Sequence, residues 1–223
     1  MPHTMPRMEF DGHIMGASFG SGDRFVAGRW HRSPIGPFAD VMWCRPDGHR
    51  VLFAPNQTVA TFIAHHYAFD EVRLESVRVE RGTDGEIVAE TGSIRMVLRP
   101  LAPGVASGLL ALRPRRLRTA TTWIGLEDRV LRPLVRGLFA AAAVRTTGET
   151  RAGAREWYAI HDFREADAAA SIDGVDLGAP APCAPSGFGF SEFPAGPALV
   201  RVTSIFKIEE TAIPGTLRRG VAG

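Results

Sequence analysis

Hydrophobic and polar residues alternate along most of the first half of the chain, in short runs separated by tight turns. The runs at 13–20 and 23–30 meet at Gly20–Asp23, where glycine allows the positive φ of a turn. The runs at 38–45 and 49–55 flank Pro46-Asp47-Gly48, in which proline presets the first turn residue and glycine suits a left-handed position. Alternation with period two predicts strands paired in antiparallel hairpins.

The spacing becomes helical in two places. Between Asn56 and Tyr67 apolar residues recur every three or four positions, and Asn56 can cap the helix. This places His66 inward and His65 outward. A second helical region is expected from about 103 to 138, interrupted at Pro114 and Pro133, because proline removes a helical hydrogen bond.

Strand patterns return at 144–150, 155–164 and 198–208, and a loop rich in proline and glycine fills 173–197. That loop is too apolar for a disordered linker, so we expect it to pack over another part of the protein. The sequence thus predicts an α+β fold built on a mainly antiparallel sheet that curls or closes into a barrel-like form. We expect a single domain over 10–213, with the helical insertion at about 103–138 and flexible ends at 1–9 and 214–223.

Composition narrows the class of protein. Hydrophobic residues make up 45% and charged residues 22%, and a formal charge of +2 does not indicate binding to nucleic acid. The two cysteines form neither a disulfide framework nor a metal knuckle. The N-terminus lacks the apolar core of a signal peptide, and the longest apolar run, 137–144, is too short to span a bilayer. We expect a cytoplasmic protein, and the oligomeric state stays open.

Asp40 is the least expected residue of the alternating runs. In a regular strand it shares a face with Met42 and Cys44, and an apolar face raises the pKa of a carboxyl group. Such a group suits acid–base chemistry. The alternative is that Asp40 caps the preceding turn or pairs with Arg29 or Arg32.

The run REWYAIHDFR offers a second candidate. Regular alternation puts Trp157, Ala159, His161 and Phe163 on one face, an aromatic wall with an embedded histidine. His161 could act as a general base, or it could be a hydrogen-bonded core residue.

The sequence gives only weak signals for a metal site, a nucleophile, a reactive lysine or an anion-binding surface. His65 and His66 point about 100° apart on a helix, so they do not chelate one ion together, and we predict no metal and no organic cofactor. No nucleophile elbow is present. Lys207, the only lysine, could form a Schiff base if desolvated, but it lies on a mixed face near Glu209. The basic run Arg113–Arg118 fits either an anionic surface or a solvated helix face.

Several segments, GRWHRSPIGPFADVM, RPDGHRVLFAP, YAFDEVRL, REWYAIHDF and the closing FGF … LVRVTS, carry a resemblance. From about Phe10 to Ile205 the chain resembles a set of conserved hypothetical proteins of actinobacteria. The resemblance implies a cytoplasmic bacterial protein and carries over no functional residues. The chain is also similar to acetoacetate decarboxylase in its expected curled β-rich body and lone lysine, but the motif around that family's reactive lysine is absent.

The leading hypothesis is a β-rich domain that binds a small hydrophobic or amphipathic molecule in an apolar pocket. An enzyme that uses Asp40, His161 and His31 in the same pocket for proton transfer, isomerisation, cyclisation or decarboxylation is the alternative. A second alternative is an interaction module that uses the arginine-rich helix on an anionic surface or a protein partner. The expected ligand contacts are Trp30, Trp43, Phe62, His66, Trp157 and Phe188, with Arg29 or Arg32 as an anion contact.

Overall fold

The computed structural model describes residues 7–138 and 144–207. Its helices are α1 (Gln57–His66), α2 (Val105–Ala111), the 3-10 turn η1 (Arg115–Leu117) and α3 (Thr121–Leu138). Its strands are β1 (Arg7–Ser18), β2 (Arg24–Arg32), β3 (Phe38–Cys44), β4 (Arg50–Ala54), β5 (Glu71–Leu74), β6 (Arg78–Arg81), β7 (Ile87–Glu90), β8 (Ile94–Pro100), β9 (Thr147–Glu149), β10 (Arg155–Ile172), β11 (Val175–Asp176) and β12 (Ala198–Lys207).

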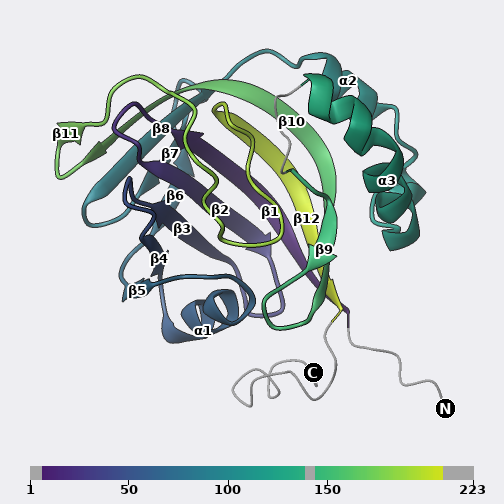
Figure 1. The fold of residues 1–223 in the computed structure, drawn as a ribbon, viewed down its shortest axis with the longest axis horizontal. Helices are drawn as coiled ribbons and strands as arrows, with labels where there is room; N and C mark the ends of the chain where they lie inside the picture. The colour runs from purple at the N-terminus through teal and green to yellow at the C-terminus, as the bar shows by residue number, and fades with distance from the viewer. Residues whose placement is uncertain (1–6, 139–143, 208–223) are drawn as a thin grey trace.

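The strands form one continuous sheet that curls until its two halves face each other. The order is β5-β4-β3-β2-β1-β12-β10-β8-β7-β6, antiparallel except for the β4–β5 pair. Long β10 makes the bend, because it pairs with β12 up to Glu165 and with β8 from Ala166 onward. In Figure 1 it arches from β9 over to the β6–β8 half. The predicted α+β fold with a curled, mainly antiparallel sheet is therefore confirmed.

The space between the two halves is a packed apolar core. It joins buried side chains of both halves, such as Met15, Phe25 and Val41 with Met96 and Leu98. Strand β6 contacts β2 and β3 across this core. We call the side of β1–β4 that points into it the core face. Because side chains alternate along a strand, the opposite side, which we call the α1 face, carries a different set of residues.

Helix α1 covers one end of the α1 face. Asn56 caps it as predicted, its side-chain oxygen accepting from Val59 N at 3.0 Å. Phe62 stacks on Phe10 with ring centroids 4.8 Å apart. His66 is buried and His65 exposed, also as predicted. Local capping and spacing thus fix this helix against the sheet.

The helical insertion contacts β10. Ile124 of α3 is buried with Ala159 and Ile205, and Ser107 of α2 donates to Asp162 Oδ1 at 2.7 Å. The predicted interruption at Pro114 is confirmed, since α2 ends at Ala111 and α3 begins at Thr121. The predicted break at Pro133 is wrong, because α3 continues to Leu138. A proline inside a helix can be absorbed by a local kink, since it removes only one hydrogen bond.

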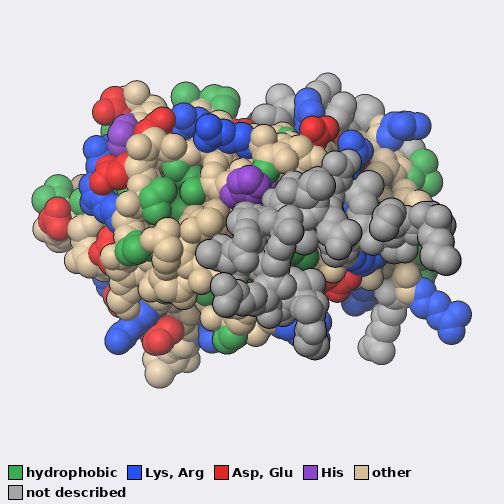
Figure 2. All heavy atoms as spheres, turned by 90° about the horizontal axis from the view of Figure 1, so that it is seen from below, with side chains coloured by type: hydrophobic (Ala, Val, Ile, Leu, Met, Phe, Trp, Pro, Cys, Tyr) green, Lys and Arg blue, Asp and Glu red, His purple; other side chains and the backbone are tan. Residues whose placement is uncertain are grey.

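Two arginines of the run Arg113–Arg118 are tied into the fold by their side chains. Arg113 forms an ion pair with Glu127 at 2.7 Å and donates to Ile160 O at 3.0 Å. Arg118 donates to Arg113 O at 3.3 Å, and Arg116 is exposed. Seen from the α1 end of the molecule, basic and acidic side chains lie side by side, with small hydrophobic patches between them (Figure 2). The described residues on that side therefore present no broad patch of one charge sign.

The predicted flexible ends fall largely outside the described residues. Strand β1 already begins at Arg7, and residues 208–223 and most of the apolar run 137–144 are not described. No helix in the described ranges is both long enough and apolar enough to cross a membrane.

Candidate functional site

Asp40 lies in the middle of the first half of the sheet, on the α1 face. It is 2% exposed and pairs in register with Gly28 of β2. Its Oδ1 accepts a hydrogen bond from Trp30 Nε1 at 3.0 Å. Burial raises the pKa of this carboxyl to about 7, and the hydrogen bond from Trp30 lowers it by less. At neutral pH both protonation states of Asp40 are therefore populated.

Gly28 makes the contact between Trp30 and Asp40 possible. A Cβ at Gly28 would lie 2.5 Å from Asp40 Oδ1 and 2.6 Å from Trp30 Nε1, closer than real contacts allow. The strand register places Asp40, Met42 and Cys44 on one face of β3, as predicted. The polar partner is Trp30, however, and not Arg29 or Arg32.

Apolar side chains that are only partly covered lie next to Asp40. Ile14 of β1, Val26 of β2 and Met42 of β3 share the α1 face and are all half-buried. Val26 pairs with Met42, and Ile14 pairs with Gly28 beside Asp40. We call these three residues the apolar strip. They offer accessible hydrophobic surface within a sheet whose core face is closed.

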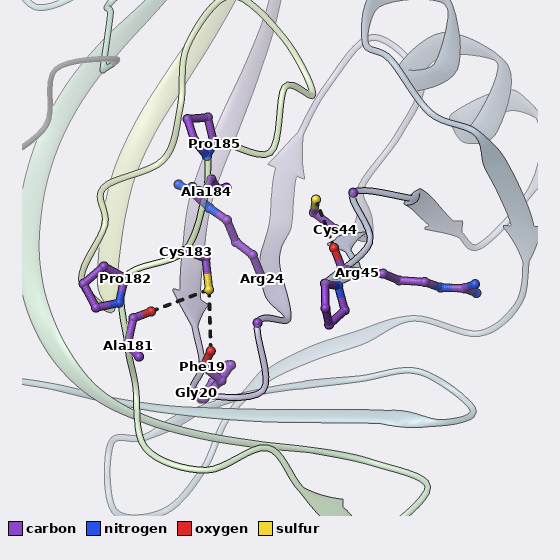
Figure 3. Close-up of a pocket in the computed structure, with 13 residues that line it drawn as sticks. Phe19, Gly20, Arg24, Cys44, Arg45, Ala181, Pro182, Cys183, Ala184 and Pro185 are labelled. Atoms are coloured by element: carbon purple, nitrogen blue, oxygen red, sulfur yellow. Dashed lines mark hydrogen bonds between the residues drawn. The ribbon is translucent and has the colours of Figure 1, made fainter.

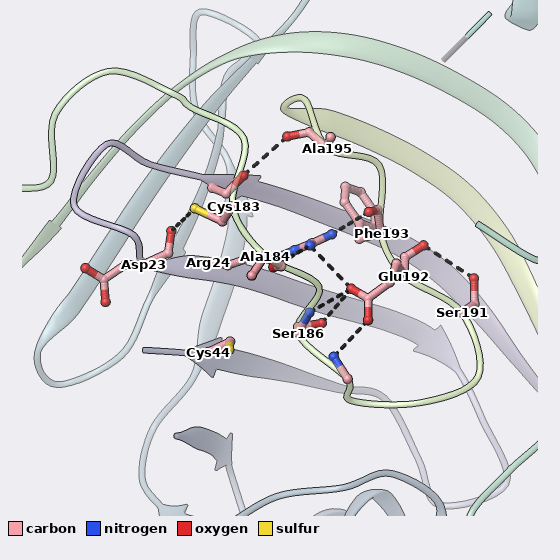
Figure 4. A network of polar contacts seen from close by, with 12 residues as sticks. Asp23, Arg24, Cys44, Cys183, Ala184, Ser186, Ser191, Glu192, Phe193 and Ala195 are labelled. Carbon is pink, nitrogen blue, oxygen red and sulfur yellow. Dashed lines mark hydrogen bonds and ion pairs between the residues drawn. The ribbon is translucent and has the colours of Figure 1, made fainter. Parts of the chain in front are cut away.

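The loop rich in proline and glycine passes over this part of the α1 face, as Figure 4 shows. Ser18 Oγ donates to Ala195 O at 3.3 Å. A Cβ at Gly16 would lie 2.7 Å from the Phe193 ring, so glycine leaves room for that ring. The loop therefore packs over another part of the protein, as the sequence predicts.

A buried ion pair fastens the loop to β2 (Figure 4). Arg24 NH1 lies 3.3 Å from Glu192 Oε2, and both side chains are largely buried. The same guanidinium donates to the Phe193 and Ala184 carbonyl oxygens. Glu192 also accepts from Ser186 N at 3.0 Å and from Gly187 N at 2.8 Å. Because every charge is met by a partner, this network can stay buried.

A cavity of about 250 Å³ opens between the loop and two hairpin turns (Figure 3). Cys44 and Cys183 stand on different walls of the cavity, and Arg24 also lines it. Burial raises the pKa of the Cys44 thiol, so this cysteine is not activated as a nucleophile. Cys44 lies four residues along β3 from Asp40, roughly 14 Å, on the same face. The cavity and Asp40 therefore mark the two ends of the surface that bears Val26 and Met42.

A second buried carboxyl group, which sequence reasoning missed as a candidate, lies farther along the α1 face. Glu156 is fully buried and accepts from Tyr67 and from Ser204, each at 2.6 Å. Tyr67 and Tyr158 hydroxyls are 3.2 Å apart. Burial raises the pKa of Glu156 to about 7. The available signal was the alternation that puts Glu156 and Tyr158 on one face of their strand.

The predicted histidines do not join Asp40. His161 is the extra residue of a bulge in β10 and lies 2.8 Å from Thr203 Oγ1 through Nε2. His31 is likewise the extra residue of a bulge in β2, and its Nε2 lies 3.0 Å from His13 Nδ1. Thr203 and His13 belong to the core-face side of their strands, so the three predicted catalytic residues do not form one constellation.

The bulge at His161 in β10 changes the predicted face of REWYAIHDFR. Trp157 and Ala159 share a face, but Phe163 pairs with Val200 and so falls on the side of Ile14. A bulge inserts one residue and shifts the alternation beyond it. Trp157 instead packs on the cluster with Ile124, and Lys207 Nζ lies 5.7 Å from its ring.

The other predicted ligand contacts are spread over the molecule. Phe62 and His66 lie on the buried face of α1, and His66 Nδ1 is 3.1 Å from Thr150 Oγ1. Burial lowers the pKa of His66 to about 4. Phe188 packs against Phe69. Trp43 points into the core and donates to Asp23 Oδ1 at 2.8 Å. Among these predicted ligand contacts, Trp30 is the one that forms a hydrogen bond with Asp40.

Two arginines, Arg29 and Arg32, were predicted as alternative anion contacts. Arg29 lies on the core-face side of β2, and Arg32 is 3.8 Å from Asp11 Oδ2. Among the residues that the structure describes, no group of three or more His, Cys, Asp and Glu side chains could hold a metal ion.

No protein-family model and no curated protein matches the chain. Among solved structures, a crystal structure described as a candidate AttH from Nitrosomonas europaea is similar to this chain, with a TM-score of 0.36 and 12% identity. The match covers 91% of this chain and 52% of the other, so the chain spans about half the length of that protein. A likeness of this size identifies no family for the chain.

Proposed function

We propose that this protein binds a small amphipathic molecule on the α1 face of its curled sheet. The apolar part of the ligand would lie on the apolar strip, and Asp40 would serve a polar group at one end. The observation that supports this most directly is the juxtaposition of accessible Ile14, Val26 and Met42 with a buried carboxyl that has one hydrogen-bond partner.

The loop at 178–197 gives the proposed site its cover. Its position over Gly16 and its attachment through Arg24 and Glu192 limit the access of water to the strip. The cavity beside Cys44 and Cys183 lies where the loop meets the hairpin turns, and it would serve as the entrance. Burial of a ligand's apolar surface there contributes roughly 25 cal/mol per Å².

The test uses the fluorescent fatty acid cis-parinaric acid and a variant that fills the strip. Val26→Trp adds a large side chain at a half-buried position, so the fold should persist while the surface for the probe is lost. Probe affinity should fall at least tenfold, measured by fluorescence titration.

Val175→Trp is the matched control, because Val175 is 68% exposed on β11, away from the strip. This variant should bind the probe like the wild type. Equal affinity of the Val26→Trp variant and the control for the probe would contradict the proposed site, provided that circular dichroism shows both variants to be folded.

Proton transfer by Asp40 is a second candidate function, favoured by its pKa of about 7. A carboxyl that is half protonated at neutral pH can donate or accept a proton at a bound carbon acid. Incubation of the wild type in deuterated water with an amphipathic ketone such as 2-decanone as the probe should then introduce deuterium at the carbons next to its carbonyl group. The Asp40→Asn variant should bind the same molecule without exchange. Equal incorporation with both proteins would rule out this role for Asp40.

A further inference from the structure

The junction between edge strand β6 and the core face of β2, which we call the seam, is lined by four basic side chains. Strand β6 contacts β2 there without a ladder of hydrogen bonds between them. A small cavity of about 60 Å³ lies at the seam. Arg29 of β2 and Arg81 of β6 line it, together with His13 and His31. Its floor is apolar and comes from the core, with Met15 and Leu199 among its residues.

The two arginines at this cavity are not neutralised by the protein. Within the described ranges, neither Arg29 nor Arg81 has a side-chain hydrogen bond or an ion pair, and both are exposed. The nearby carboxylate, Asp11, is engaged by Arg201 through two nitrogens and lies 3.8 Å from Arg32. Like charges that line one cavity repel each other unless an anion lies between them.

The two histidines add hydrogen-bonding capacity to the positive field. His13 Nδ1 and His31 Nε2 are 3.0 Å apart, so one imidazole donates to the other. Burial, followed by the charges of Arg201, His31, Arg29 and Arg81, lowers the pKa of His13 to about 4. Burial and Arg29 also lower the pKa of His31, whereas Asp11 acts in the opposite direction. The cavity therefore lies in a net positive potential.

We propose that this cavity is an oxyanion site, in which a phosphate or carboxylate group bridges Arg29 and Arg81 and accepts a hydrogen bond from the His13–His31 pair. Guanidinium groups match the geometry of such oxygens, and a cavity of about 60 Å³ suits a single small anionic group. The site lies on the opposite side of the sheet from Asp40 and is independent of the function proposed above. Occupation would link β6 to β2 across the open seam.

The experiment follows thermal unfolding of the full chain as sodium phosphate or sodium acetate replaces sodium chloride at constant ionic strength. At least one oxyanion should raise the melting temperature in a saturable manner, because it binds only the folded state. Saturation by phosphate or by acetate identifies which group the site prefers. Arg29→Gln and Arg81→Gln should each weaken the apparent affinity at least tenfold.

Arg78→Gln is the matched control, since Arg78 is exposed on the same strand β6 but does not line the cavity. It should keep the wild-type response. A second readout is the NMR titration of His13, whose pKa should rise when the oxyanion is bound. The proposal is overturned if neither oxyanion acts beyond chloride, or if Arg78→Gln loses the response as completely as Arg81→Gln.

Discussion

At the scale of single residues, Asp40 shows how neighbours set the properties of a side chain. It is 2% exposed, it accepts a hydrogen bond from the uncharged indole of Trp30, and no arginine of the described residues forms an ion pair with it. The folded-state pKa of about 7 lies above the ordinary value of 3.8. The folded protein therefore binds a proton at Asp40 more tightly than the unfolded chain does. This stabilising effect is complete below the unfolded-state pKa of 3.8, falls as the pH rises above it, and is lost once the pH has passed through 7.

Asp40→Asn should remove that pH dependence while keeping an oxygen that accepts from Trp30. The free energy of unfolding of the variant minus that of the wild type should rise by on the order of 3 kcal/mol between pH 5 and pH 8. Urea unfolding at several pH values measures the difference. Asp84→Asn, at an exposed turn, is the control and should leave the curve unchanged. A difference between Asp40→Asn and wild type that is flat with pH would contradict the account.

Residue-level prediction from the sequence worked where it needed only strand alternation. The shared face of Asp40, Met42 and Cys44 follows from period two within one strand. The directions of His31 and His161 did not follow, because each is the extra residue of a bulge and local sequence does not mark where a ladder is interrupted. The partner of Asp40 was also missed, since it depends on how β2 and β3 pair.

At the scale of elements, the covering loop is held by a buried ion pair rather than by regular secondary structure. Glu192 joins Arg24 of β2 to Ser186 and Gly187 within the loop. Removal of one partner leaves the other charge buried and unpaired, which costs about 3–5 kcal/mol. Because the loop has no regular secondary structure of its own, we expect much of this cost to appear as local opening of the loop.

Glu192→Gln should therefore loosen the loop without unfolding the sheet. The amides of Ser186 and Gly187 should exchange with deuterium at least tenfold faster, while those of β1 and β12 keep wild-type rates. Hydrogen exchange read by mass spectrometry resolves the two regions. Glu165→Gln, on the exposed side of β10, serves as the control. Unchanged exchange at 186–187 would show that the ion pair does not hold the loop.

Elements whose signals are local were predictable from the sequence. Asn56 caps α1, and Pro46-Asp47-Gly48 turns between β3 and β4, as their residue types require. The continuation of α3 through Pro133 was not predictable, because a proline ends some helices and only kinks others. The ion pair between Arg24 and Glu192 that holds the loop could not be predicted, since the two residues are 168 positions apart in sequence number.

At the scale of the whole molecule, the curl of the sheet decides which surfaces are closed and which stay available. The two halves enclose a packed core, whereas the half-buried side chains of the apolar strip lie on the outer, α1 face of β1–β3. The sequence predicted an antiparallel curled sheet but not this division. The insertion of β12 between β1 and β10 and the bend of β10 are long-range pairings that no local pattern specifies.

The central claim is that a ligand occupies the α1 face and not the space between the sheet halves. Intermolecular NOEs between cis-parinaric acid and isotope-labelled methyl groups of the protein test it most directly. The account predicts NOEs to Ile14, Val26 and Met42 and none to Met96 or Leu98, which are buried in the core. NOEs to Met96 and Leu98 without any to the apolar strip would contradict it.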